Sequence, residues 1–210
     1  MTHRQTRRVY DYLAGVYPLS TYFFHSKAHC LALQMAGIQD GMRVLEVATG
    51  SGEMFRRLVE VNRNGTTVGL DLSPKMAART QRRAREEFPA SSATCQAVDA
   101  RHLPFRNDSF DAVVCCYLLE LLSTDDIATA LQEFRRVLRP RGNFTLVLIG
   151  QHTGLFNVAY KVCGGIAPAF WGRQVDSGLP DMMEAAQLTV TAEKTLRQGF
   201  YPSRVLQARK

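Results

Sequence analysis

The spacing of apolar residues changes near residue 42, and this change divides the chain into two parts. Before it, apolar residues recur at helical spacing and predict two short helices, over residues 9–17 and 28–36. After it, short apolar runs alternate with helical segments. We therefore expect one domain, in which a helical N-terminal lid, residues 1–40, packs on an α/β core, residues 41–210.

The core pattern is typical of parallel βαβ units, because each strand is a continuous apolar run of the kind buried on both faces. Pro18 and Gly37 are expected to end the two N-terminal helices. Thr124 is expected to cap the helix after the fourth strand, and Pro140 and Gly142 to close it. The predicted strands are 44–47, 66–70, 93–98, 110–116, 144–149, 189–195 and 200–208, and the core helices are 55–61, 74–88, 124–138 and 179–186.

Composition narrows the class of protein further. Hydrophobic residues make up 46% of the 210 positions, yet no apolar run approaches the ~20 residues that span a bilayer. The first residues lack the apolar core of a secretory signal, so we expect a cytoplasmic protein. The five cysteines form no CxxC pair and no Cys/His cluster of zinc spacing, which predicts reduced core thiols and no metal site.

The net charge of +7 favours anionic partners, either nucleic acid or an anionic membrane surface. A basic surface that is merely solvated explains the same charge equally well.

The glycine-rich turn after the first strand carries the clearest chemistry. Gly50 and Gly52 allow the backbone to approach a ligand closely, and the following helix points its first N–H groups at that ligand. Asp71 ends the second strand about 20 residues later, where a carboxylate can hold a ribose diol. This spacing fits an enzyme that uses either NAD or S-adenosylmethionine (SAM).

Two residues separate these cofactors. Phe55 occupies the position of the third glycine of the dinucleotide motif, where it is too large for close packing of the helix on the strand. Glu46 would repel a pyrophosphate but can accept hydrogen bonds from an amino-acid ammonium group, which SAM has and NAD lacks. Asp99, after the third strand, could accept a hydrogen bond from the adenine amino group.

With these residues in order, the run from Val44 to Ile149 resembles the class I SAM-dependent methyltransferases. It is most similar to the branch containing the ubiquinone/menaquinone biosynthesis C-methyltransferases and the small bacterial phosphatidylethanolamine N-methyltransferases. Ala48 and Arg141 stand where the family commonly has glycine, and Pro18 stands where an aspartate often follows the tyrosine. The matching segments cover about half the chain and are VLEVATGSG, VGLDLS, VDARHLPFRNDSFDAV and LQEFRRVLRPRG.

The resemblance implies a Rossmann-like α/β fold, with a seven-stranded, mostly parallel sheet, helices on both faces and an antiparallel last strand. It also implies SAM as cofactor and S-adenosylhomocysteine as product, with the methionine part held by the first-strand loop, the ribose by Asp71 and the adenine by the second and third strand ends. The implied cofactor-binding residues are Glu46, Ala48, Thr49, Gly50, Ser51, Gly52, Asp71, Leu72, Met76, Asp99, Ala100, Cys116 and Tyr117.

The acceptor must be inferred from the flanking segments. The basic, aromatic N-terminal helix suits a membrane interface, and residues 156–171 offer apolar surface that could cover a hydrophobic substrate. These features favour a lipid or hydrophobic small molecule, such as phosphatidylethanolamine or a quinone precursor, and peripheral membrane attachment. An oxygen or carbon acceptor needs a general base, and Tyr17, His25 and Glu120 are the candidates on the acceptor side, with His152 beside them.

Three other functions stay open. A nucleic-acid methyltransferase would suit the basic charge, but Cys116-Tyr117-Leu118-Leu119 stands where enzymes that methylate a base amine often carry Asn/Asp-Pro-Pro-aromatic. A membrane-associated module that binds SAM without turnover, and an NAD dehydrogenase, are the others. The acceptor atom, the number of methyl transfers and the oligomeric state are open at this point.

Overall fold

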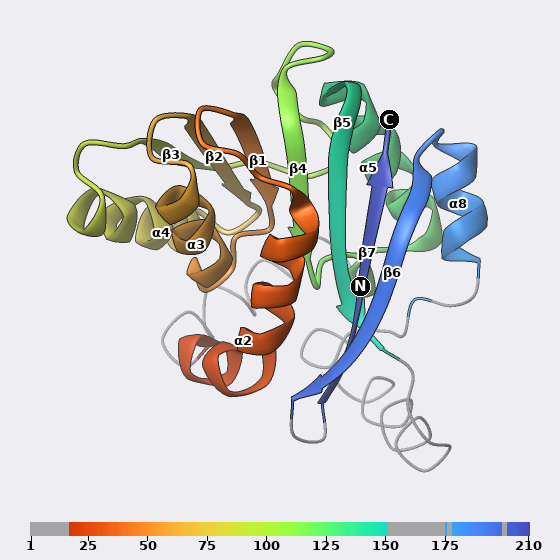
Figure 1. Ribbon diagram of the computed structural model, residues 1–210, viewed down its shortest axis with the longest axis horizontal. Helices are drawn as coiled ribbons and strands as arrows, with labels where there is room; N and C mark the ends of the chain where they lie inside the picture. Colours follow the sequence, from red (N-terminus) through yellow and green to blue (C-terminus); the bar gives the residue numbers. More distant parts are fainter. Residues whose placement is uncertain (1–16, 151–174, 176–177, 199–200) are drawn as a thin grey trace.

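The computed structural model describes residues 17–150, 175, 178–198 and 201–210. Its centre is a seven-stranded sheet of strand order β3-β2-β1-β4-β5-β7-β6 (Figure 1). Neighbouring strands from β3 to β5 pair in parallel, whereas β7 runs antiparallel to both β5 and β6. The strands are β1 (Arg43–Val47), β2 (Thr66–Asp71), β3 (Ser92–Ala97), β4 (Phe110–Cys116), β5 (Leu138–Ile149), β6 (Thr189–Gln198) and β7 (Tyr201–Arg209).

Helices cover both faces of the sheet (Figure 1). On one face, α2 and α3 pack against Val44, Ala112 and Val147, while α5 and α8 pack on the opposite face against Leu45 and Val113. The faces alternate along each strand because successive strand residues point to opposite sides. The helices are α2 (Tyr17–Ala36), α3 (Glu53–Val61), α4 (Pro74–Glu87), the 3₁₀ turn η1 (Leu119–Leu121), α5 (Thr124–Val137) and α8 (Leu179–Ala185).

The predicted fold class is confirmed: the sheet is mostly parallel, with its last strand antiparallel and helices on both faces. α2 ends at Ala36, and Gly37 follows with a φ of 62°, as expected for a glycine that stops a helix. The predicted helix over residues 9–17 lies almost wholly outside the described residues. Within the described part, no helix is long and apolar enough to cross a membrane.

Three boundary predictions were wrong. Pro18 does not end a helix but lies in the first turn of α2, where its missing N–H removes no intrahelical hydrogen bond. Ser123, not Thr124, caps α5, since its hydroxyl accepts the Asp126 N–H at 3.2 Å. β5 begins at Leu138, because pairing with Phe110 extends the strand through the segment that was expected to close the preceding helix.

Arg141 lies in this extended segment with a φ of 65°, in the left-handed region that favours glycine. Because its side chain is exposed, Arg141→Gly should remove backbone strain without opening a cavity. We expect this variant to raise the free energy of unfolding by about 1 kcal/mol, measured as a higher urea midpoint at an unchanged m-value. Arg141→Ala keeps a Cβ and serves as the control, so an equal gain in that variant would contradict the explanation.

Candidate functional site

A pocket lies where the carboxyl ends of β1 and β4 meet helix α2. The pocket is lined by the end of β1 and the loop that follows it, by the end of β4, by the first turn of α3 and by residues of α2. Its lining residues are His25, His29, Glu46, Ala48, Thr49, Gly50, Ser51, Met54, Cys116 and Tyr117.

The loop after β1 is tightly wound. Ala48, Gly50 and Gly52 all have positive φ angles, of 65°, 50° and 79°. The Gly52 N–H donates to the carbonyl of Thr49 at 2.8 Å, and a Cβ on Gly52 would lie 2.8 Å from the Thr80 hydroxyl oxygen. Glycine is therefore required at position 52, whereas Ala48 adopts the glycine-like conformation at some cost in strain.

Glu46 is a buried carboxyl group at the bottom of this pocket. Its side chain is 1% exposed, and its Oε2 atom has no hydrogen-bond partner among the described residues. Burial, together with the nearby carboxylate of Asp71, raises the pKa of Glu46 well above its usual range. The pocket thus holds an unsatisfied acid that a cationic donor would stabilise in its ionised form.

Asp71 lies at the end of β2 and holds the loop together. One carboxylate oxygen accepts the Gly50 N–H at 2.7 Å, and the other accepts the Ser73 N–H at 2.9 Å. The Ser73 hydroxyl in turn accepts the Met76 N–H at the start of α4. Asp71 is therefore placed beside Glu46, and its carboxylate organises the turns after both β1 and β2.

The predicted adenine-side residues lie further along the same sheet edge. The Asp99 carboxylate accepts two hydrogen bonds from the guanidinium of Arg101, at 2.6 and 3.0 Å, and Arg101 also bonds Asp126 at 2.8 Å. Met76 is fully buried, whereas Leu72 and Ala100 are partly exposed. None of these residues lines the pocket that contains Glu46, and a direct role in adenine binding stays a prediction.

Tyr117 forms the wall of the pocket at the end of β4. Its ring stacks on His25, with ring centroids 4.2 Å apart, and its hydroxyl lies 2.7 Å from the Ser203 hydroxyl on β7. Its φ of 54° is unusual for a bulky residue. Such strain occurs at sites where surrounding contacts hold one geometry. Burial, followed by the proximity of His29, lowers the pKa of His25 to about 3, so this imidazole is neutral.

His29 and Met54 are pocket residues that the sequence analysis missed. His29 is 4% exposed, and its Nδ1 atom has no hydrogen-bond partner among the described residues. Burial, and then the charge of Arg57, lower its pKa to about 4. The available signal was its position one helical turn after His25, which places both rings on one side of α2.

Glu120 occupies a different position, on the turn η1 that follows β4. It is 2% exposed; its Oε1 accepts the Ile149 N–H at 2.6 Å, while Oε2 has no described partner. Burial raises the pKa of Glu120 to about 7, against the opposing effect of the Ile149 hydrogen bond. The other two candidate bases, Tyr17 and His152, have side chains outside the part of the chain that the structure describes.

A family model described as "Methyltransferase domain" matches residues 44–142, the segment that contains the loop and both acidic strand ends. The chain is 29% identical over 177 residues to the ubiquinone/menaquinone biosynthesis C-methyltransferase UbiE of Methylococcus capsulatus, covering 80% of this chain and 70% of that protein. It is 28% identical over 148 residues to the 2-phytyl-1,4-naphtoquinone methyltransferase of Trichormus variabilis, covering 68% of this chain and 64% of that protein.

The matched segment and these relatives support a class I SAM-dependent methyltransferase, and the chain spans less than two thirds of the length of the Trichormus variabilis relative. The fold agrees with a solved complex of the Haloferax volcanii Trm112 methyltransferase activator with a methyltransferase. That match has a TM-score of 0.81 at 19% identity and covers 97% of this chain and 96% of that one.

The pocket fits the amino-acid end of SAM. SAM carries an ammonium group, and the unpartnered oxygen of Glu46 is the buried acceptor that such a group needs. The tight loop leaves no side chain at Gly50 or Gly52 to obstruct the approach. The described residues contain no group of His, Cys, Asp and Glu that could hold a metal ion.

Proposed function

We propose that this protein transfers the methyl group of SAM to a ring carbon of a hydrophobic, hydroxylated aromatic acceptor of the quinol type. The observation that carries the cofactor part is the buried Glu46 oxygen, which has no described partner and belongs to a residue that lines one pocket with the glycine loop. Two relatives support the acceptor part, because one is a 2-phytyl-1,4-naphtoquinone methyltransferase and the other a C-methyltransferase of ubiquinone/menaquinone biosynthesis.

The chemistry of the acceptor selects its reduced form. A SAM sulfonium supplies an electrophilic methyl group, so the acceptor carbon must donate electrons. The ring of a quinone is electron-poor, whereas the ring of a hydroquinone becomes a carbon nucleophile when one hydroxyl loses its proton. This reaction therefore requires a base near the acceptor as well as alignment of the two partners.

Among the described candidates, Glu120 matches that role best. A general base works best when its pKa lies near the working pH. The pKa of Glu120 is about 7, whereas the pKa values of His25 and His29 are about 3 and 4, which makes both imidazoles weak bases. Glu120 does not line the pocket that contains Glu46 but lies at the same edge of the sheet, where its Oε1 accepts the Ile149 N–H at the end of β5. From this position and its pKa we assign to Glu120 the acceptance of the hydroxyl proton, and to the neutral rings of His25 and Tyr117 an apolar, aromatic wall for the acceptor.

The test is incubation of the protein with radiolabelled SAM and one acceptor class at a time: a long-chain naphthoquinone kept reduced, the same compound oxidised, phosphatidylethanolamine vesicles, and RNA. We expect label only with the reduced quinone, and mass spectrometry should show a gain of one CH2 on a ring carbon. Labelled phosphatidylethanolamine would replace the quinol assignment by amine methylation. Flotation with anionic vesicles would test peripheral membrane attachment, which belongs to the same proposal.

Asp71 provides a direct test of the cofactor site. Asp71→Asn loses the charge that would hold the ribose hydroxyls, and its single oxygen can accept only one of the two backbone N–H groups, of Gly50 and Ser73, that Asp71 now accepts. We expect the Kd for SAM to rise about ten- to a hundredfold, since a hydrogen bond to a charged group contributes ~1.5–3 kcal/mol. Calorimetric titration measures this change, and Asp108→Asn, at an exposed position, is the control. An unchanged Kd would count against ribose binding at β2.

A further inference from the structure

The buried imidazole of His29 is not explained by the glycine-loop motif. Its ring is almost fully buried, its Nδ1 has no described partner, and it lines the pocket that contains Glu46. A buried polar atom without a partner is costly, and such atoms are rare in folded proteins unless a ligand or water completes them. His29 is therefore a candidate ligand-binding group on the lid helix.

The second unsatisfied atom in this pocket belongs to Glu46. Alternation along β1 places Glu46 on the same face of the sheet as Val44, and Val44 packs with Ala28 and Ala32 of α2 in one cluster. His29 follows Ala28 on that helix. His29 and Glu46 thus line one pocket from two different elements, and one polar atom of each, Nδ1 and Oε2, requires a partner.

An ammonium group carries several N–H donors on one nitrogen and can therefore satisfy two acceptors at once. We propose that His29 binds the α-ammonium group of SAM: its Nδ1 accepts one N–H, and Glu46 accepts another. This inference rests on the proposed function, because it takes SAM to be the cofactor. It assigns to helix α2 a direct part in cofactor binding, in addition to covering the acceptor.

The protonation state of the ring agrees with this role. Burial and the nearby guanidinium of Arg57 keep the pKa of His29 at about 4, so the imidazole is neutral at physiological pH. A neutral imidazole has one nitrogen with a lone pair and can accept a hydrogen bond from a cation. A protonated ring would instead repel the ammonium group.

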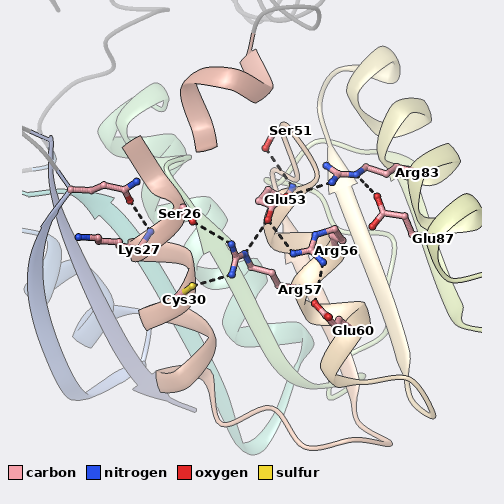
Figure 2. A network of polar contacts seen from close by, with 11 residues as sticks. Ser26, Lys27, Cys30, Ser51, Glu53, Arg56, Arg57, Glu60, Arg83 and Glu87 are labelled. Carbon is pink, nitrogen blue, oxygen red and sulfur yellow. Dashed lines mark hydrogen bonds and ion pairs between the residues drawn. The ribbon is translucent and has the colours of Figure 1, made fainter. Parts of the chain in front are cut away.

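Arg57 also fixes α2 against the loop (Figure 2). Its guanidinium donates to the Cys30 sulfur at 3.0 Å and the Ser26 hydroxyl at 3.3 Å, both on α2. Its Nε lies 3.2 Å from Glu53, whose backbone N–H donates to Ser51 in the glycine loop. Because these contacts flank His29 in the sequence, its ring is held in place relative to the loop before any ligand binds.

The experiment compares two variants against three ligands by calorimetric titration. His29→Leu removes both ring nitrogens at similar volume, whereas His29→Asn keeps a polar oxygen near the position of Nδ1. The ligands are SAM, decarboxylated SAM, which keeps the amine but lacks the carboxylate, and methylthioadenosine, which lacks the whole amino-acid part. We expect His29→Leu to raise the Kd of both amine-containing ligands about ten- to a hundredfold and to leave the Kd of methylthioadenosine unchanged. His29→Asn should bind all three ligands with nearly wild-type affinity.

Each other outcome overturns the assignment. An equal loss of affinity for methylthioadenosine would show that the substitution disturbs the fold of the site. A loss of affinity for SAM but not for decarboxylated SAM would mean that His29 contacts the carboxylate of SAM. Wild-type affinity in His29→Leu would remove the contact altogether. If the wild-type protein bound none of the three ligands, the proposed function would fail together with the role of His29. If the wild-type protein and His29→Leu bound SAM equally well, only the role of His29 would fail.

Discussion

Glu120→Gln is expected to lower kcat for methyl transfer to a reduced quinone at least about a hundredfold, while leaving the Kd for SAM unchanged. Removal of a general base typically costs ~10²–10⁴ in rate. The glutamine amide oxygen can still accept the Ile149 N–H that Glu120 now accepts at 2.6 Å. The variant should therefore keep the junction between η1 and the end of β5 intact and lose only the proton acceptor.

The pH dependence gives this prediction a second readout. The base acts in its ionised form, and the pKa of Glu120 is raised to about 7. The wild-type rate should therefore rise with pH through about 7 and level off above it, whereas the residual rate of Glu120→Gln should lack this rise. Stopped assays from pH 5.5 to 8.5 would measure it, with the exposed Glu86→Gln as control.

A variant with wild-type kcat would eliminate Glu120 as the base. If instead both kcat and SAM affinity fell and the melting temperature dropped, Glu120 would serve to hold the end of β5. These results separate a chemical role from a structural one because only the chemical role affects the pH profile at constant stability.

The fold and the cofactor edge of the sheet could be predicted because their signals are local. Each buried parallel strand is a continuous apolar run, and Glu46 and Asp71 end two of these runs on either side of a glycine turn. The carboxyl ends of parallel strands meet at one edge, so their order in the chain already places them together. Residues 44–142 accordingly carry the family match.

The residues that were missed or placed differently depend on long-range contacts. His29 enters the site only because α2 packs on this face of the sheet, against β5, β6 and β7 and against α3, and no nearby motif specifies these contacts. Asp99 has the expected position after β3, but its carboxylate bonds Arg101, which also binds Asp126 on α5. Local propensity likewise did not distinguish Ser123 from Thr124 as the cap of α5, since both are good N-cap residues.

Glu46→Gln is expected to bind SAM at least about a hundredfold more weakly than the wild type, yet to be more stable in the absence of ligand. Loss of one partner from a buried charge pair costs ~3–5 kcal/mol, which corresponds to a factor of about a hundred or more in affinity. The gain in stability follows from the raised pKa of Glu46, which burial and Asp71 cause together.

The sign of that gain can be worked out from proton linkage. The folded protein retains the Glu46 proton at pH values where the unfolded chain has lost it. Wild-type stability therefore falls as pH rises from the ordinary glutamate pKa towards the raised one, by about 1.4 kcal/mol for each unit of upward shift. Glutamine does not titrate, so Glu46→Gln should match the wild type in acid and melt at a higher temperature near pH 8.

Binding of SAM should show the opposite dependence. Only ionised Glu46 can pair with the cofactor ammonium, so the wild-type Kd should decrease as pH rises, and binding should release a proton, detectable by calorimetry in buffers of different ionisation enthalpy. The pKa values of His25 and His29, about 3 and 4, lie below this range. Glu46→Gln should bind weakly and without pH dependence. If Glu46→Gln lost both stability and affinity, Glu46 would be a structural residue. A buried acid that serves function is instead expected to lower the stability of the folded protein.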